Sequence, residues 1–469
     1  MPADIALVEG KIFTMNKAQP CAEAVALKGD RIIKFGTTAE VSCLIERSTK
    51  IIRLGGKPVY PGLIDTHIHV SDFGRFLMWM DLTDTGSISE LQDLLAQQLE
   101  KTKAGKWVVG RGWNEKRFSE KRLPTRFDLD AVSMDNPVIF YHQSGQIAVV
   151  NSKALKVGGV TKQTNAPVGG VIDKSGETGE PTGILREGAT DLVWKLIPEP
   201  SLDELVEAAA LACQKIVQAG LTSIHWLAES EVDVVILKRL LAANLLPLRV
   251  YMVVPASLLN DSDLLDELRE GWAKIGGVEV YADGFLAART AALFKPYQKE
   301  PENSGKLLCT QEELNKTAKS VVSRGFQLVV HAMGDKAVDA AVTAIETLKD
   351  GRRSRIDSAA LLNKSLIQRI KKQKIVVSVQ PLVAASEFSV YNAKTHLGKA
   401  RAKWLYPLKT LFSEGVSVCG GSDCPMEPLN PLLGVQSAVA RPAFPEEQLT
   451  VDEAFKMYTV NAAQASCEE

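Results

Sequence analysis

Polar and apolar positions alternate in short runs through residues 1–60 of the chain. Turn residues separate the runs, and Gly29-Asp30 is a two-residue hairpin signal between two alternating stretches. Alternation with a period of two is typical of strands that bury one face. The runs at 5–10, 11–16, 22–36 and 50–62 therefore predict a small β unit, part of a β-sandwich, over 1–60.

From residue 62 onward, strand-like runs alternate with helical ones, the order expected of βα units around a parallel sheet. Eight runs have the pattern of strands: 63–67, 222–226, 248–254, 278–283, 327–332, 355–358, 375–380 and 416–422. Apolar residues at i, i+3 and i+4 predict helices at 202–218, 231–243, 264–275, 311–324, 336–349, 364–374 and 402–413. Eight strands, with no GxGxxG or GxxxxGK[ST] after any of them, favour an α/β fold built on a (β/α)8 TIM-type barrel over an open nucleotide-binding sheet.

A long stretch without a barrel strand, about 71–200, follows the first predicted strand. It is rich in Gly and Pro between residues 158 and 183, and we expect it to be an insertion. The predicted organisation is a β-sandwich portion at 1–60 and a barrel at 61–469 that includes this insertion.

Composition and charge indicate which classes of binding partner the protein has. Lys and Arg (55) balance Asp and Glu (56), and a net charge of -1 does not draw the chain to nucleic acid or to an anionic membrane. No stretch reaches the roughly 18 unbroken apolar residues of a membrane helix, and Asp4 and Glu9 stand where a signal peptide needs basic and apolar residues. We therefore expect a cytoplasmic protein that acts on a small molecule. Its 7 scattered cysteines, without a CxxC pair, predict reduced thiols.

The residues best suited to chemistry stand where the predicted barrel strands end, the face on which barrel active sites lie. The first strand ends Asp65-Thr66-His67-Ile68-His69, and the i, i+2 spacing puts both imidazoles on one face of an extended chain, where they can hold one ion. A lone buried histidine is more often structural than a ligand, but three of the 6 histidines fall at strand ends, which favours a metal site. The other candidates at strand ends are Glu279, Asp283, His331 and Asp423.

The run from Pro61 to His69, PGLIDTHIH, resembles the first-strand motif of the amidohydrolase superfamily. Other stretches resemble its amidohydrolase family 3 branch: GRGWNE (110–115), LPTRFDLDAVSMDNPV (123–138), NSKAL (151–155), PTGILRE (181–187), YADGFLAARTA (281–291), HAMGDKAVD (331–339), SVQP (378–381) and GGSDCPMEPLNP (420–431). The resemblance runs from residue 4 to residue 469. It implies a metal-dependent hydrolase that acts on a C–N bond other than a peptide bond in an amide-like or cyclic small molecule.

The same resemblance implies roles for individual residues. His67 and His69 would bind the more buried metal, and Glu279 would replace the carboxylated lysine that bridges two metals in many members. His331 would serve the second metal, while Asp423 would bind the first metal and act as general base on its bound water. Imidazole and carboxylate ligands make Zn²⁺ the expected divalent ion.

Two departures from the family pattern bear on this site. Ser358 stands where the family has a metal-binding histidine after the sixth strand, and a serine hydroxyl is a poor zinc ligand. We therefore expect one tightly bound ion and a doubtful second site. Gln146 stands where the family usually has a histidine, so its expected substrate contact is a hydrogen bond. Trp113, Asp283 and Arg289 are the other substrate-binding candidates implied by the resemblance.

A third departure concerns the β-sandwich. Family members continue past the helix predicted at 450–465 into further strands, so we expect this sandwich to be incomplete at the C-terminus. Unpaired strand edges would then favour a homodimer.

Two other functions stay open at this point. A catalytically degenerate family member would fold and bind metal or ligand without turnover, as the changes at Ser358 and Gln146 suggest. A barrel enzyme without metal would use Asp283 or Asp423 as acid and base. Metal content separates the last alternative from the other two, and turnover separates the active hydrolase from the degenerate one.

Overall fold

The computed structural model describes residues 1–348 and 353–468. The chain divides into two compact units, one formed by Met1–Val70 with Cys213–Glu469 and the other by Ser71–Ala212. The first unit holds the barrel and the N-terminal β segment, and the second corresponds to the long stretch between the first two barrel strands. The predicted boundary between a sandwich at 1–60 and a barrel at 61–469 stays a prediction.

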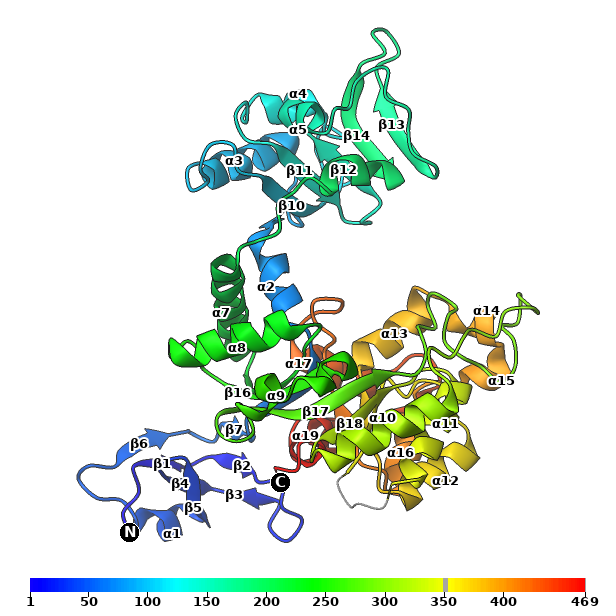
Figure 1. The fold of residues 1–469 in the computed structure, drawn as a ribbon. Coiled ribbons are helices and arrows are strands. Elements are labelled where there is room, and N and C mark those ends of the chain that lie inside the picture. Colours follow the sequence, from blue (N-terminus) through cyan, green and yellow to red (C-terminus); the bar gives the residue numbers. More distant parts are fainter. Residues whose placement is uncertain (349–352, 469) are drawn as a thin grey trace. The chain divides into compact units, whose positions relative to one another are not determined.

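Eight parallel strands form an almost closed barrel in the first unit, as the sequence predicted (Figure 1). In the order of the sheet they are β21 (Val418–Gly420), β20 (Val376–Val379), β19 (Arg355–Asp357), β18 (Gln327–His331), β17 (Ala273–Tyr281), β16 (Arg249–Pro255), β15 (Leu221–Leu227) and β8 (Leu63–Ile68). Each barrel strand pairs in parallel with the barrel strand that follows it in the sequence. The carboxyl ends of all eight therefore lie at one rim.

The first and last barrel strands, β8 and β21, are joined by backbone hydrogen bonds at their carboxyl ends. The backbone N–H of Asp423 donates to the carbonyl of His67 at 2.8 Å, and the N–H of His69 donates to the carbonyl of Cys424 at 3.0 Å. These bonds close the barrel at its carboxyl rim. They also bring the HxH run of the first strand against the loop that follows the eighth.

Helices surround the barrel, and most lie where the apolar periodicity predicted them (Figure 1). Those that match are α7 (Leu202–Gln218), α8 (Glu231–Ala242), α10 (Gln311–Ser323), α11 (Asp335–Glu346) and α12 (Lys364–Lys372). Residue 349, the last of the predicted 336–349 helix, lies outside the described residues. A capping box fixes the start of α10, because Thr310 accepts from the N–H of Glu313 while the Glu313 carboxylate accepts from the N–H of Thr310.

Three predicted helices are wrong in extent. The helix predicted over 450–465 is divided into α18 (Val451–Met457) and α19 (Val460–Ala465). Instead of a helix over 264–275, the chain forms the short α9 (Ser262–Asp266), and β17 begins at Ala273, just after Gly271 at a φ of 108°. In place of the predicted helix over 402–413, α15 (Lys399–Ala402) ends at Ala402 and α16 (Leu408–Glu414) begins after Pro407, its N-cap residue. Between the two helices, Leu405 forms a β-bridge with Leu361. The other α-helices described in this unit are α1 (Thr38–Ser42), α13 (Pro381–Ser389), α14 (Ala393–Leu397) and α17 (Pro431–Val439), and its described 3₁₀ turns are Ala256–Asn260 and Pro445–Glu447.

The N-terminal segment forms two small sheets, as predicted for a β unit. The 4-stranded sheet has the order β5 (Arg31–Gly36), β4 (Ala24–Lys28), β1 (Ile5–Val8), β6 (Lys50–Arg53), and the 3-stranded sheet has the order β3 (Cys21–Ala22), β2 (Lys11–Phe13), β7 (Pro58–Val59). The hairpin predicted at Gly29-Asp30 is confirmed, because Lys28 pairs with Arg31 in the antiparallel ladder and Gly29 takes a φ of 55°. All strands of both sheets come from residues 5–59.

The second unit is built on a 6-stranded sheet in the order β13 (Gly170–Lys174), β14 (Pro181–Glu187), β12 (Ile147–Val150), β11 (Val138–His142), β10 (Val108–Trp113), β9 (Met80–Asp81). Its helices include α2 (Val70–Met78), α3 (Ile88–Leu99), α4 (Arg126–Asp130), α5 (Ser152–Val157) and α6 (Asp191–Trp194). Two apolar clusters stabilise it, one containing Trp113 and Phe140 and the other Ile139 and Leu185. Over the described part of the chain, no helix combines the length and apolar character needed to span a membrane.

Candidate metal centre

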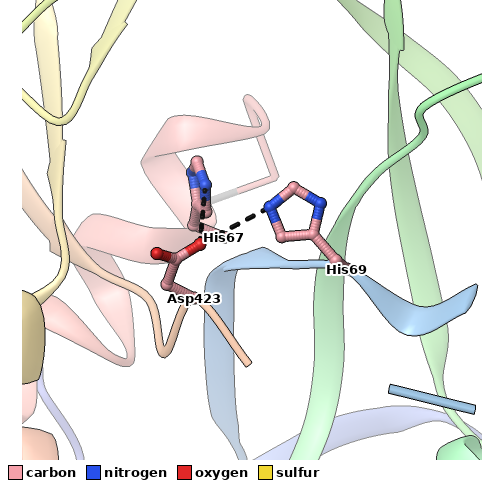
Figure 2. A group of neighbouring side chains, drawn as sticks. All are labelled: His67, His69 and Asp423. Carbon is pink, nitrogen blue, oxygen red and sulfur yellow. Dashed lines mark ion pairs between the residues drawn. The ribbon is translucent and has the colours of Figure 1, made fainter. Parts of the chain in front are cut away.

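Three side chains converge where β8 and β21 meet at the carboxyl rim (Figure 2). His67 and His69 leave β8 two residues apart, and Asp423 enters from the loop after β21. The Nε2 atoms of both histidines lie 3.5 Å from the Oδ1 atom of Asp423. His67 is buried, and His69 and Asp423 are partly buried, so the three side chains are largely shielded from solvent.

This group fits a divalent ion. One nitrogen from each histidine and a carboxylate oxygen of Asp423 all lie within 4.8 Å of one another. Tetrahedral ligands about 2.0–2.1 Å from one zinc ion are about 3.4 Å apart, which is close to the 3.5 Å between Nε2 of each histidine and Oδ1 of Asp423. Two imidazoles and one carboxylate are also the donor set of catalytic zinc sites, which use three protein ligands and leave one position open.

Asp65 holds the two halves of this group together. Its Oδ1 atom accepts from the N–H of His67 and from the N–H of Ser422, each at 3.0 Å, so one buried carboxylate joins β8 to the end of β21. Burial raises the pKa of Asp65 to about 6, although these hydrogen bonds act in the opposite direction.

The electrostatics of Asp423 favour its charged form. Burial alone would raise the pKa of this carboxyl, but the hydrogen bond from His69 and the charge of His67 lower it below its ordinary value. Asp423 also takes a φ of 62°, in the left-handed region that non-glycine residues rarely adopt. Its backbone is held there by the hydrogen bond to the His67 carbonyl.

A match to a protein-family model covers most of the chain. The model of the amidohydrolase family (Amidohydro_3) matches residues 50–469. The chain belongs to the amidohydrolase family. Family membership and the metal-dependent hydrolases among its relatives support a hydrolase that uses a divalent metal.

Individual relatives match this amidohydrolase over nearly its whole length. The putative amidohydrolase YtcJ of Bacillus subtilis is 33% identical over 97% of this chain and 88% of its own. The N-substituted formamide deformylase of Arthrobacter pascens is 27% identical over 99% of this chain and 89% of its own. An uncharacterized metal-dependent hydrolase from Pyrococcus furiosus has a solved structure that is 30% identical, with a TM-score of 0.80 over 99% of this chain and 95% of that one.

The two other predicted ligands lie near the carboxyl ends of two strands that pair with each other, β17 and β18. Glu279 and His331 are buried in β17 and β18, and neither belongs to the compact group formed by His67, His69 and Asp423. Among the described residues, Glu279 Oε1 and His331 Nε2 have no hydrogen-bond partner although both atoms are buried. Burial raises the pKa of Glu279 to about 7 and lowers that of His331 to about 4. Their role as ligands of a second ion stays a prediction.

Ser358, which stands in place of the expected histidine, belongs to a different contact. Its hydroxyl donates to Oε1 of Gln380 at 3.2 Å, and its N–H donates to the carbonyl of Ser378. Its φ of 58° also departs from the extended geometry of β19. The sixth strand therefore ends in a neutral hydrogen-bonded pair.

The predicted substrate residues of the barrel unit have partners within the protein. Asp283 is fully buried, and its carboxylate accepts from the N–H groups of Ala292, Met333 and Gly334 at 2.8–2.9 Å. These bonds give Asp283 a structural role that joins two loops of the rim. Arg289 forms an ion pair with Glu300 at 2.6 Å. Contacts of Asp283 and Arg289 with substrate stay predictions.

Trp113 and Gln146 belong to the other unit. The Trp113 side chain has no exposed surface, and its indole N–H donates to the carbonyl of Phe140 at 2.8 Å, which are the features of a core residue. Gln146 is exposed in the turn between β11 and β12, where its carbonyl accepts from the N–H of Glu187. Their contacts with substrate also stay predictions.

Sequence reasoning missed a buried polar cluster beneath the histidines. Arg355 and Asp357 point into the barrel from β19, and they contact Thr66, His67 and His225. The i, i+2 spacing of Arg355 and Asp357 on one predicted strand was the available signal, because it puts both side chains on one face. A charged pair in a strand that is otherwise buried indicates such a cluster.

Proposed function

We propose that this amidohydrolase hydrolyses a C–N bond other than a peptide bond in a small amide-like molecule, and that it uses one tightly bound Zn²⁺ ion. The observation that carries the proposal is the group of His67, His69 and Asp423 at the carboxyl rim of the barrel. Barrel enzymes place their active sites at this rim. Residue 358 is a serine where the family has a metal-binding histidine, which supports a single ion.

Side chains of this protein would bind the ion and accept one proton from the attacking water. His67, His69 and Asp423 would be its ligands. When bound, such an ion polarises the scissile carbonyl and lowers the pKa of a water molecule, so that the water can attack near neutral pH. Because neighbouring histidines keep the pKa of Asp423 low, its carboxylate is ionised at neutral pH and can accept the proton that the attacking water loses.

The substrate class is proposed from a relative of this chain. The Arthrobacter pascens relative is named for the deformylation of N-substituted formamides, and it matches 99% of this chain. We therefore propose N-substituted formamides as the first substrates to test, followed by cyclic amides, carbamates and acylated amino acids. The partner would thus be a small molecule, with no role for nucleic acid or membrane.

Elemental analysis combined with a turnover assay tests the proposal. We expect about one equivalent of zinc per chain, hydrolysis of at least one substrate class, loss of turnover on chelation, and recovery when zinc is restored. A His69→Asn variant should lose both metal and turnover, while His396→Asn, at a half-buried histidine outside the group, should keep both. Turnover that survives complete removal of metal would contradict the proposal. Stoichiometric metal without turnover of any class would favour the degenerate family member.

A further inference from the structure

A buried arginine and aspartate from β19 lie directly beneath the metal ligand His67. The Nδ1 atom of His67 lies 2.9 Å from Oδ2 of Asp357, and both side chains are almost completely buried. The other ring nitrogen, Nε2, faces Asp423 and the candidate metal position. His67 therefore lies between a carboxylate behind it and the ion site in front.

The charge of Asp357 is fixed by Arg355. The guanidinium donates to both carboxylate oxygens of Asp357, and neither side chain has any exposed surface. Because a guanidinium has donors and no acceptor, both oxygens of Asp357 act as acceptors in these bonds. A hydrogen bond between Oδ2 of Asp357 and Nδ1 of His67 then has the imidazole N–H as its donor.

Arg355 is itself held by three strands. Beyond Asp357 on its own strand β19, it donates to the carbonyl of Thr66 in β8 and, at 2.8 Å, to Nδ1 of His225 in β15. His225 accepts this bond as a neutral imidazole, and burial followed by the charge of Arg355 keeps its pKa well below the ordinary value. Contacts with β8 and β15 thus hold Arg355 in place, and Arg355 in turn fixes the position of Asp357.

We propose that Asp357, held by Arg355, is the positioning residue of the metal centre: it keeps the hydrogen of His67 on Nδ1 and so directs the Nε2 lone pair at the ion. Ligating histidines generally donate their second N–H to such a partner, which fixes the ring orientation and raises the ligand's basicity. The sixth strand, which ends in Ser358 instead of a ligand, would then contribute to metal binding through its preceding residue. The inference rests on the metal site of the proposed function.

Metal affinity of an Asp357→Asn variant tests this role without any substrate. The amide N–H₂ of the asparagine can donate to Nδ1 of His67. The ring hydrogen of His67 would then lie on Nε2, where it points at the ion position in place of the lone pair. We expect the dissociation constant for Zn²⁺, measured by chelator competition, to rise about 10- to 100-fold, and the visible spectrum of the Co²⁺-loaded protein to change. A structural role alone would lower the stability of the metal-free protein and leave both readouts unchanged.

Glu447→Gln is a matched control for the loss of a buried carboxylate. Glu447 accepts from the hydroxyl and N–H of Thr410 at 2.6 and 2.9 Å, and it contacts none of the three metal-binding side chains. This variant should lose stability with an unchanged zinc affinity. Asp357→Glu, which keeps the charge and the acceptor atoms, should recover part of the affinity.

A second variant covers the case in which Asp357→Asn does not fold because Arg355 is left unpaired. The double variant Arg355→Met/Asp357→Asn removes both charges together and should fold with the same weakened affinity. An affinity within about twofold of wild type in either folded variant would overturn the inference. A wild-type chain that binds no zinc would overturn both the inference and the metal site, whereas a chain that binds zinc without turnover would leave the inference standing.

Discussion

The backbone N–H of Asp423 donates to the carbonyl of His67 across 2.8 Å, so two residues of the proposed metal site also close the barrel. Asp65 repeats this connection, because it accepts from the N–H groups of His67 and Ser422. The geometry of the site and the closure of the sheet therefore depend on the same contacts. A change that separates β8 from β21 should weaken both.

Gly421→Ala should disrupt this closure. A Cβ at Gly421 would lie 2.6 Å from both the backbone N and the Cβ of His67, and a backbone atom in a closed sheet cannot move aside cheaply. We expect a loss of about 1–3 kcal/mol in the free energy of unfolding and a weaker zinc affinity. Thermal unfolding with chelator and zinc titration measure the two effects. Gly176→Ala, where a Cβ would meet nothing within 4 Å, is the control, and equal behaviour of the two variants would refute this account.

Asp423→Asn should abolish hydrolysis while the fold survives. The amide keeps the shape of the side chain but neither accepts the proton as readily nor neutralises a bound cation. We expect kcat/KM on a turned-over substrate to fall by at least roughly 10³-fold, with a far-ultraviolet circular dichroism spectrum like that of wild type. Asp135→Asn, at an exposed carboxylate, should retain full activity. Near wild-type turnover in Asp423→Asn would remove Asp423 from the role of general base.

Ser358→His should increase the metal bound per chain. Glu279 Oε1 and His331 Nε2 are buried and unpartnered among the described residues, and an added imidazole would give them a third ligand. The metal content measured by elemental analysis is expected to rise from about one to about two ions per chain. Adding Glu279→Gln to this variant should cancel the gain. An unchanged stoichiometry would show that residue 358 does not reach the second position.

Glu387→Gln should stabilise the protein at high pH only. Burial raises the pKa of Glu387 from 4.5 to about 7, although a hydrogen bond from the backbone of Ala287 opposes the shift. The folded state therefore holds this proton more tightly than the unfolded state. The stability that comes from this bound proton is fully present below pH 4.5 and is lost as pH rises through about 7, a total of about 3 kcal/mol.

Denaturant titrations at pH 5 and pH 8 with chelator measure this effect. The free energy of unfolding of Glu387→Gln should exceed that of wild type by about 3 kcal/mol at pH 8 and by much less at pH 5. Glu302→Gln, at an exposed carboxylate, should show no such difference between the two pH values. Equal gains at both pH values for Glu387→Gln would mean that the carboxyl is not the cause.

Local sequence patterns predicted much of the barrel because strand and helix periodicities depend on near neighbours. The short apolar run of β18 and the i, i+3, i+4 pattern of α10 each follow from residues a few positions apart. The prediction failed where contacts between distant parts of the chain overrode periodicity. Leu405, between α15 and α16, forms a β-bridge with Leu361, and the segment that starts at Ala273 pairs with β16. Local periodicity reveals neither contact.

By itself, the sequence determined the order of barrel strands, the HxH pair and the polar residues at the strand ends. Only the tertiary structure decided that His67, His69 and Asp423 form one group, that Asp283 faces backbone N–H groups, and that Asp357 lies behind His67. Asp357 and His67 are separated by 290 positions along the chain. Their contact depends on the closure of β8, β19 and their neighbours into one barrel, and no local periodicity carries that information.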